Sequence, residues 1–175
     1  GGTGTAKQLT IENTNTAGVA LRFINEASNN TIKFVTLQSV NTSVTSGTVV
    51  LSTTTGGFGN DNNTLDTCDI RDGATTPSVA IVSRGTTTTT AQANSGNTVT
   101  NCNIFNFYSA STLHCGVLLD TGSSDWTLSG NSFYQTTTRP AVAVARTVAS
   151  ILISGSGGNN FTITGNFIGG SAPSC

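Results

Sequence analysis

The chain has 175 residues, a formal net charge of −1 and only 9% charged residues, against roughly 25% in an average globular protein. Thr, Ser, Asn and Gly take the place of the missing charges, and the lack of a basic patch argues against a nucleic-acid partner. No apolar run approaches the ~18 residues that a membrane-spanning helix needs, so no membrane span is expected.

A seven-residue phrase, in which apolar residues alternate with polar ones, recurs six times along the chain. Its copies occupy residues 5–11, 31–37, 64–70, 98–104, 127–133 and 162–168. Successive copies begin 26, 33, 34, 29 and 35 residues apart. A repeat of this length indicates a solenoid, in which each coil packs only on its neighbours.

Each copy is predicted to form two short strands separated by a bend. In the second copy the alternation that indicates half-buried strands is broken between Ile32 and Val35. A third strand is predicted after most copies, at residues 19–21, 49–51, 79–81, 117–119 and 142–144. No helical pattern is present. The variable stretches are expected to be loops on one side that often form a binding surface: residues 52–61, 84–96, 108–114 and 146–158.

Three short strands in each unit predict an all-β parallel β-helix of about six coils, stacked ~4.8 Å apart. The phrases Thr-Leu-Ser-Gly-Asn-Ser-Phe (residues 127–133) and Thr-Ile-Thr-Gly-Asn-Phe-Ile (residues 162–168) resemble the repeats of the right-handed parallel β-helix superfamily, the pectate-lyase-like fold. The resemblance covers nearly the whole chain and implies a right-handed solenoid, but it says little about function. A β-sandwich also has many short strands, yet it would not keep one phrase in register six times.

Residues 1–175 are expected to be a single β-helix segment of a longer protein. The chain starts inside the first copy and stops shortly after the last one, without an initiating Met or a signal peptide. No amphipathic helix flanks the copies, although the end coils of a solenoid need caps. A neighbouring domain or a partner chain is therefore expected to cover an end.

Stacking places equivalent residues of successive copies in columns, one of which points inward. Its members are Leu9, Val35, Cys68, Cys102, Asn131 and Asn166. A buried amide needs hydrogen-bond partners. Asn131 and Asn166 are therefore expected to bond to each other and to the backbone.

The chain contains four cysteines, and two of them are neighbours in that column. Cys68 and Cys102 would be ~4.8 Å apart, which a disulfide allows, but their Cβ bonds would be nearly parallel. The sequence is therefore compatible both with a disulfide between these two cysteines and with two buried free thiols. Cys115 and Cys175 would be joined if the terminal segment folds back, and an even count in a low-charge chain favours oxidation. Because Cys-x-x-Cys spacing is absent, no metal or other cofactor is predicted.

One outward column consists of threonine in every copy: Thr5, Thr31, Thr64, Thr98, Thr127 and Thr162. Threonine is common on exposed strands for structural reasons. A flat threonine array can also match ice, as in β-helical ice-binding proteins. In the second rank, which lies two residues further along each copy, Lys33, Asp66 and Ser129 interrupt the array.

A second outward column offers a surface for sugars. Phe105 and Tyr134 are expected to be stacked and exposed beside Arg71, with amide, hydroxyl and carboxylate groups next to them. The alternative is that a loop or another domain covers the rings. The candidate glycan contacts are Asp69, Arg71, Asn103, Phe105, Ser132 and Tyr134.

Support for catalysis is thin. The resemblance implies acidic calcium ligands with an Arg or Lys base, as in the lyases of the superfamily, or a cluster of aspartates, as in its hydrolases. Asp66, Asp69 and Asp72 share one coil, but the neighbouring coils supply too few carboxylates for a calcium site or an acid–base pair. His114 is expected to be a solvated loop residue without an acidic partner. No catalytic residue is predicted.

The expected function is that of a secreted or cell-surface module with a structural and adhesive role that contacts polysaccharide. A fragment of a polysaccharide lyase or glycoside hydrolase is the first alternative. An ice-binding module is the second.

Overall fold

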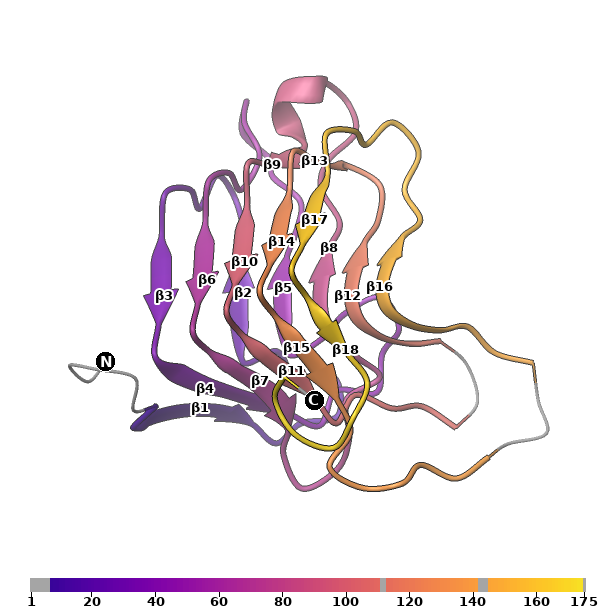
Figure 1. Cartoon of the computed structure of the whole chain (residues 1–175). Coiled ribbons are helices and arrows are strands. Elements are labelled where there is room, and N and C mark those ends of the chain that lie inside the picture. Colours follow the sequence, from indigo (N-terminus) through magenta and orange to yellow (C-terminus); the bar gives the residue numbers. More distant parts are fainter. Residues whose placement is uncertain (1–6, 111–112, 142–144, 175) are drawn as a thin grey trace.

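The computed structural model describes residues 7–110, 113–141 and 145–174. Within these ranges the chain is all-β apart from one short 3-10 helix, η1 (Thr90–Gln92). Equivalent strands of successive coils line up in three long parallel sheets, which Figure 1 shows from the side. The described residues include no helix that is long and apolar enough to cross a membrane.

The three long sheets are called sheets A, B and C. Sheet A contains β1 (Leu9–Asn13), β4 (Val35–Ser39), β7 (Asp69–Asp72), β11 (Asn103–Phe105), β15 (Ser132–Tyr134) and β18 (Phe167–Ile168). Sheet B contains β2 (Leu21–Phe23), β5 (Val49–Leu51), β8 (Val79–Ser83), β12 (His114–Leu119) and β16 (Val148–Ile153). Sheet C contains β3 (Thr31–Lys33), β6 (Thr64–Asp66), β10 (Thr98–Thr100), β14 (Thr127–Ser129) and β17 (Thr162–Thr164). Between sheets B and C, the two short strands β9 (Asn94–Ser95) and β13 (Ser123–Ser124) pair at one corner.

The chain passes through the sheets in the order C, A, B. Among the described residues four coils have a strand in all three long sheets, and they begin at β3, β6, β10 and β14. Strands β1–β2 and β17–β18 form part of a coil at either end. In Figure 1 the chain descends through sheet C on the near side, rises through sheet B on the far side and advances from left to right, which makes the coil right-handed. The predicted right-handed parallel β-helix is confirmed, with four complete coils rather than six.

The predicted bend between two short strands is present in the copies that have strands in sheets C and A, and a residue with positive φ lies at each bend. Phe34 has a φ of 55° between β3 and β4, and Thr67 has a φ of 54° between β6 and β7. This left-handed conformation is unusual for a β-branched residue. The equivalent residues are Asn101, Gly130 and Gly165, which tolerate it better.

The third strand departs from the prediction in two coils. In the first coil it begins at Leu21 instead of residue 19. The strand predicted at residues 142–144 falls outside the described residues, and sheet B is continued by β16, inside the stretch 146–158 that was predicted to be a loop. β16 carries its own apolar pattern, since Ile151 pairs with Val117 and packs against the core.

Two predicted columns of inward side chains form the core. They are at most 3% exposed in the central coils, at Leu65, Val99 and Leu128 of sheet C and at Leu37, Ile70, Ile104 and Phe133 of sheet A. The same columns open to solvent at the ends. Ile11, which precedes Leu37 in its column, is 36% exposed, and Ile163 and Ile168 are 43% and 63% exposed at the other end, because no further coil packs on them among the described residues.

The predicted amide pair is part of a longer ladder. Asn166 Oδ1 accepts hydrogen bonds from the backbone N and the Nδ2 of Asn131, both at 3.0 Å. Asn131 Oδ1 accepts one from Cys102 N at 2.9 Å. Cys102 Sγ then accepts one from Cys68 N at 3.4 Å. The cysteines thus take the place of asparagines in the two preceding coils.

The disulfides considered from the sequence are not found. Cys68, Cys102 and Cys115 are buried free thiols, and Cys175 lies outside the described residues. Cys68 and Cys102 point the same way along the ladder, and each thiol donates to a carbonyl of the coil before its own. Cys115 Sγ donates to Val117 O at 2.9 Å.

A second ladder, which was not predicted, runs along the corner before sheet C. Asn97 Oδ1 accepts hydrogen bonds from Asn63 N at 2.9 Å and from Asn63 Nδ2 at 3.1 Å. Asn97 Nδ2 donates to Asn60 O at 3.0 Å. In the next coil Trp126 replaces the asparagine, and its buried Nε1 donates to Asn94 O at 3.0 Å.

Candidate functional site

The predicted aromatic strip forms on the outer face of sheet A. The rings of Phe105 and Tyr134 are stacked, with centroids 4.7 Å apart and an interplanar angle of 8°. Arg71 Cζ lies 5.2 Å from the centroid of the Phe105 ring. The register of β7, β11 and β15 therefore brings these three candidates together as expected.

The expectation that these rings are exposed is wrong. Phe105 and Tyr134 are each 7% exposed, and burial raises the pKa of Tyr134 to about 12. The alternative reading, in which other parts of the chain cover the rings, fits the structure.

The polar candidates beside the rings already have partners. Asp69 Oδ1 accepts hydrogen bonds from Lys7 Nζ at 2.6 Å and from Asn103 Nδ2 at 2.7 Å. Ser132 Oγ accepts one from Ser174 N at 3.1 Å. Segments near both ends of the described chain therefore occupy part of the polar side of the strip, and Arg71, 37% exposed, is itself paired with Asp72.

Four aspartates are held in ion pairs with basic side chains. Their partners are Lys33 for Asp66, Lys7 for Asp69, Arg71 for Asp72 and Arg84 for Asp120. The hydrogen bond from Lys33 holds the pKa of Asp66 below its usual value. Burial opposes ionisation of Asp120, but the Thr121 N–H and Arg84 outweigh it and lower the pKa of that carboxyl. Each carboxylate is tied to its own base, which is the arrangement of structural ion pairs.

His114 is not the solvated loop residue that the sequence suggested. It is the first residue of β12 and is 7% exposed. Its Nδ1 lies 3.2 Å from Ser109 O, and burial is the main cause that holds its pKa below the usual value.

The threonine column is in register on the outer face of sheet C. Thr31, Thr64, Thr98, Thr127 and Thr162 follow one another across the five strands, and Thr5 lies outside the described residues. In the second rank Lys33 pairs with Asp66 at 2.8 Å, and the hydroxyls of Thr100 and Ser129 are 3.0 Å apart. In Figure 1 none of the loops within the described ranges crosses this face.

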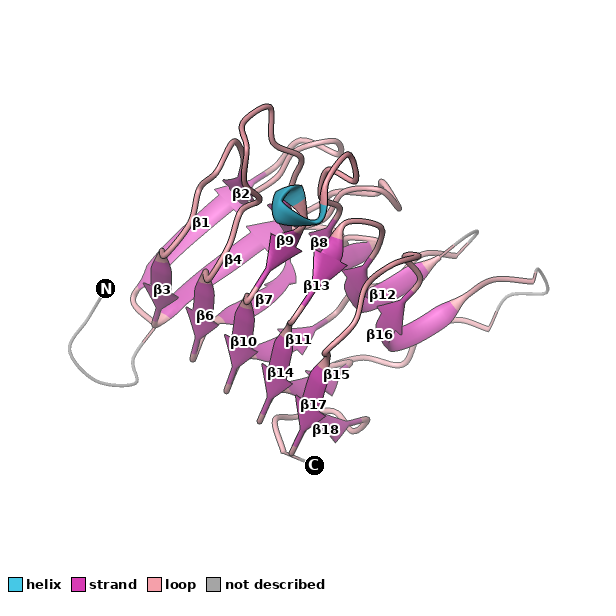
Figure 2. Cartoon of the chain, turned by 90° about the horizontal axis from the view of Figure 1, so that it is seen from above, coloured by secondary structure: helices cyan, strands magenta, loops and turns pink. Residues whose placement is uncertain are grey.

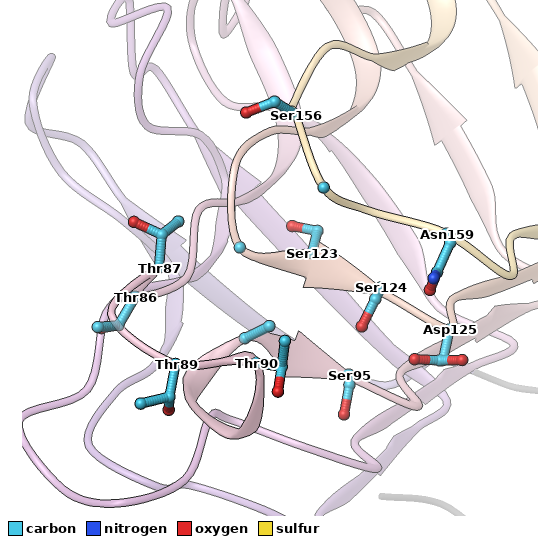
Figure 3. A pocket seen from close by; sticks show the side chains of 13 residues that line it. Thr86, Thr87, Thr89, Thr90, Ser95, Ser123, Ser124, Asp125, Ser156 and Asn159 are labelled. Atoms are coloured by element: carbon cyan, nitrogen blue, oxygen red, sulfur yellow. The ribbon is translucent and has the colours of Figure 1, made fainter.

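A cavity at the corner between sheets B and C was not predicted from the sequence. We call it the hydroxyl groove, and it encloses about 370 Å³. Figure 3 shows the turn at residues 86–90 on one side, the segment at residues 156–159 on the other, and β9 and β13 between them. Thirteen residues line it: Thr86, Thr87, Thr89, Thr90, Ala93, Ser95, Gly122, Ser123, Ser124, Asp125, Ser156, Gly157 and Asn159.

Most of the polar groups in the hydroxyl groove make no hydrogen bond with another described residue. This applies to the hydroxyls of Thr87, Thr90, Ser95, Ser124 and Ser156. The side-chain amide of Asn159 also makes no such hydrogen bond. Asp125 uses only its Oδ1, which accepts a hydrogen bond from Asn160 Nδ2 at 2.9 Å. The groove thus offers neutral donors and acceptors with a single carboxylate.

The floor of the groove is rigid because two coils approach closely there. A Cβ on Gly122, which has a φ of 68°, would lie 2.6 Å from the carbonyl carbon of Gly85, so only glycine fits. Beneath the floor, Ser123 Oγ donates to the hydroxyl or the carbonyl of Ser83. The exposed hydroxyls therefore stand on a fixed backbone.

The sequence did contain a signal for this groove. Three residues before the last five copies of the phrase stands a short polar side chain: Ser28, Asp61, Ser95, Ser124 and Asn159. The backbone stacks this column, since Asn62 N donates to Ser95 O and Asp125 N donates to Asn159 O. The groove also needs the turn at residues 86–90, whose path no repeat predicts.

Comparisons with known proteins find no matching family model, curated protein or solved structure. In the described ranges, His, Cys, Asp and Glu side chains do not gather in groups of three or more that could hold a metal ion.

Proposed function

We propose that the protein is a secreted or cell-surface β-helix module with a structural and adhesive role, and that it binds a neutral polysaccharide in the hydroxyl groove. The observation that carries the proposal is that six hydroxyl and amide side chains in this groove, those of Thr87, Thr90, Ser95, Ser124, Ser156 and Asn159, make no hydrogen bond with another described residue. At the level of fold, the repeated phrase supports a relationship to the pectate-lyase-like superfamily.

The chemistry of the groove suits sugar hydroxyls. A hydroxyl both donates and accepts hydrogen bonds, so Ser95, Ser124 and Thr90 match a ligand that also carries hydroxyls in several directions. Asp125 adds one acceptor for a charge-assisted bond. The fixed floor keeps these groups in place before binding, which limits the entropy lost when a ligand binds.

The expected affinity is low. Each neutral hydrogen bond contributes about 0.5–1.5 kcal/mol net, and association has its own entropic cost. A dissociation constant on the order of millimolar to micromolar follows. An adhesive module reaches useful strength at this affinity when several copies bind one polymer.

Affinity electrophoresis in gels that contain xylan, galactomannan or hydroxyethyl cellulose tests the proposal. The wild-type protein should be retarded by at least one of these neutral polymers. Ser124→Tyr places a ring in the groove and should weaken binding by about tenfold or more. Asp125→Asn should cause a smaller loss, because it keeps the shape and removes the charge-assisted bond.

The matched control is Thr164→Tyr, which adds the same side chain to the exposed outer face of sheet C. It should bind like the wild type. The proposal fails if no neutral polymer retards the wild type, or if Ser124→Tyr and Thr164→Tyr bind equally well while both remain folded by circular dichroism.

The threonine face supports a second candidate function, the binding of ice. Five in-register threonines on an uncovered sheet, with hydroxyls at Thr100, Ser129 and Thr164 in the next rank, present a regular array. Thermal hysteresis of the wild type, lost in Thr127→Tyr, would support ice binding. No hysteresis in the wild type would reject it.

The lyase or hydrolase alternative makes a separate prediction. A fragment with either activity would release unsaturated or reducing sugar ends from the same polymers. A protein that is retarded by a polymer without releasing such ends is a binding module.

A further inference from the structure

A second cluster of polar side chains surrounds the ring of Tyr108, away from the hydroxyl groove. We call it the Tyr108 cluster, and its members are Tyr108, His114, Arg139 and Arg146. The described parts of the loop from β11 to β12 and of the loop from β15 to β16 lie side by side in both views of the chain, at the lower right of Figure 1 and at the right of Figure 2. Two hydrogen bonds of 3.0 Å join them, from Tyr108 Oη to Pro140 O and from Arg146 Nη1 to Ser109 O.

Both arginines of the cluster approach the same aromatic ring. Arg146 Cζ lies 5.3 Å and Arg139 Cζ lies 5.7 Å from the centroid of Tyr108. The chain has seven Lys and Arg residues, all within the described ranges, and four of them form ion pairs with aspartates. Of the other three, Arg22 lies on β2, and the remaining two meet at Tyr108. The described acidic side chains therefore leave this positive charge unbalanced.

The two guanidinium groups retain most of their donors. A guanidinium has five N–H groups. Within the described residues Arg139 uses one of them, in the bond from Nε to Gln135 Oε1 at 2.7 Å, and Arg146 uses one, in its bond to Ser109 O. The other N–H groups of both side chains are available to a ligand.

His114 is the fourth member of the cluster. Its ring centroid is 5.3 Å from that of Tyr108. Burial and, to a smaller extent, the charges of Arg146 and Arg139 keep the pKa of His114 below its usual value. At neutral pH the imidazole is therefore uncharged, and the positive charge of the cluster comes from the arginines.

We propose that the Tyr108 cluster binds an oxyanion carried by a sugar polymer, either a sulfate ester or a carboxylate. Guanidinium groups form paired, charge-assisted hydrogen bonds with such oxyanions. The partly exposed ring of Tyr108 supplies an apolar face against which a sugar ring packs. This site is independent of the hydroxyl groove and does not depend on neutral-polymer binding there.

Affinity electrophoresis with dextran sulfate, polygalacturonate and unsubstituted dextran tests the inference. The wild type should be retarded by at least one of the two polyanions. Unsubstituted dextran carries no oxyanion, so it should not bind at the Tyr108 cluster. The double variant Arg139→Gln/Arg146→Gln should bind the polyanion about a hundredfold more weakly, at about tenfold for each lost contact. Arg146→Lys keeps the charge without the planar fork and should show an intermediate loss. The polyanion that retards the wild type more strongly shows whether the preferred oxyanion is a sulfate ester or a carboxylate.

Arg22→Gln is the matched control, because it removes the same charge from an unpaired arginine on another face. It should leave polyanion binding within about twofold of the wild type, since it removes no contact. Ser124→Tyr should also leave this binding unchanged, which separates the cluster from the groove. Equal losses in Arg22→Gln and in the double variant would overturn the inference, and so would the absence of polyanion binding by the wild type.

A titration of the wild type avoids any problem of folding in the variants. His114 is the only histidine of the chain, so its ring signals in a proton NMR spectrum need no further assignment. Inorganic sulfate should shift these signals in a saturable way, whereas chloride at the same ionic strength should not. Identical responses to the two salts would reject an oxyanion site at the cluster.

Discussion

Replacing Asn97 with alanine tests the ladder at the corner before sheet C. The change removes the acceptor of Asn63 N and of Asn63 Nδ2, and both residues are at most 3% exposed. A buried donor without a partner costs about 1–3 kcal/mol. Two of them give an expected loss of about 2–6 kcal/mol, a large part of the 5–15 kcal/mol that stabilises a typical domain.

Urea unfolding followed by far-ultraviolet circular dichroism measures this loss. The midpoint should fall while the dependence on urea concentration stays the same, because the surface exposed on unfolding does not change. Asn30→Ala is the control, since Asn30 is an exposed member at the end of the ladder and accepts no hydrogen bond there from a described residue. If Asn97→Ala costs no more than Asn30→Ala, the amide ladder does not stabilise the solenoid and the reasoning is refuted.

Three further predictions concern the core, the thiols and the ends. Ile104→Ala should lower the free energy of unfolding by about 2–5 kcal/mol, because coils on both sides keep the cavity from closing; a loss below ~1 kcal/mol in urea unfolding would contradict the buried column. Burial raises the pKa of Cys115 from 9.0 to about 12, so the native state keeps a proton that the unfolded chain releases, and stability should fall by up to about 1.4 kcal/mol per pH unit between about pH 9 and 12. Cys115→Ala should remove that part of the slope, and equal slopes in the two proteins would count against a buried thiol. Ile163→Lys/Ile168→Lys should reduce self-association, because it places charges on the exposed apolar end; a wild type that is already a monodisperse monomer by light scattering would argue against a partner at that end.

The repeated phrase predicted the solenoid because each copy meets the same environment. Ile32, Val35 and Leu37 have equivalents in every coil, so both the alternation and a bend between Ile32 and Val35 could be read from the sequence. The left-handed conformation of Phe34 at that bend could not, because the phrase does not specify φ. The second ladder was also accessible, since Asn63 and Asn97 hold the same place in consecutive copies. Whether these two asparagines form a hydrogen-bonded ladder depends on the position of backbone groups in the next coil, which the phrase does not show.

The surfaces were harder to predict, because they depend on segments that do not repeat. The stacking of Phe105 on Tyr134 follows from register, but their burial depends on what lies over them. The partners of the polar candidates beside the rings come from near both ends of the described chain, where Lys7 and Ser174 lie. The hydroxyl groove likewise needs the turn at residues 86–90 to fold back over β9. Sequence periodicity constrains neither segment.

The way in which each coil bonds only to the coils beside it has a consequence for how such a chain changes its length. Residues 65–98 span one full repeat, so their removal would join Thr64 directly to Val99 at the same place in the phrase. The shortened strand would read Thr-Val-Thr, and the left-handed bend would pass from Thr67 to Asn101. Gene duplication or loss of whole repeats therefore alters the height of the protein in steps of ~4.8 Å and leaves every column in line. The threonine face and the ladders lengthen or shorten together with the rod that carries them.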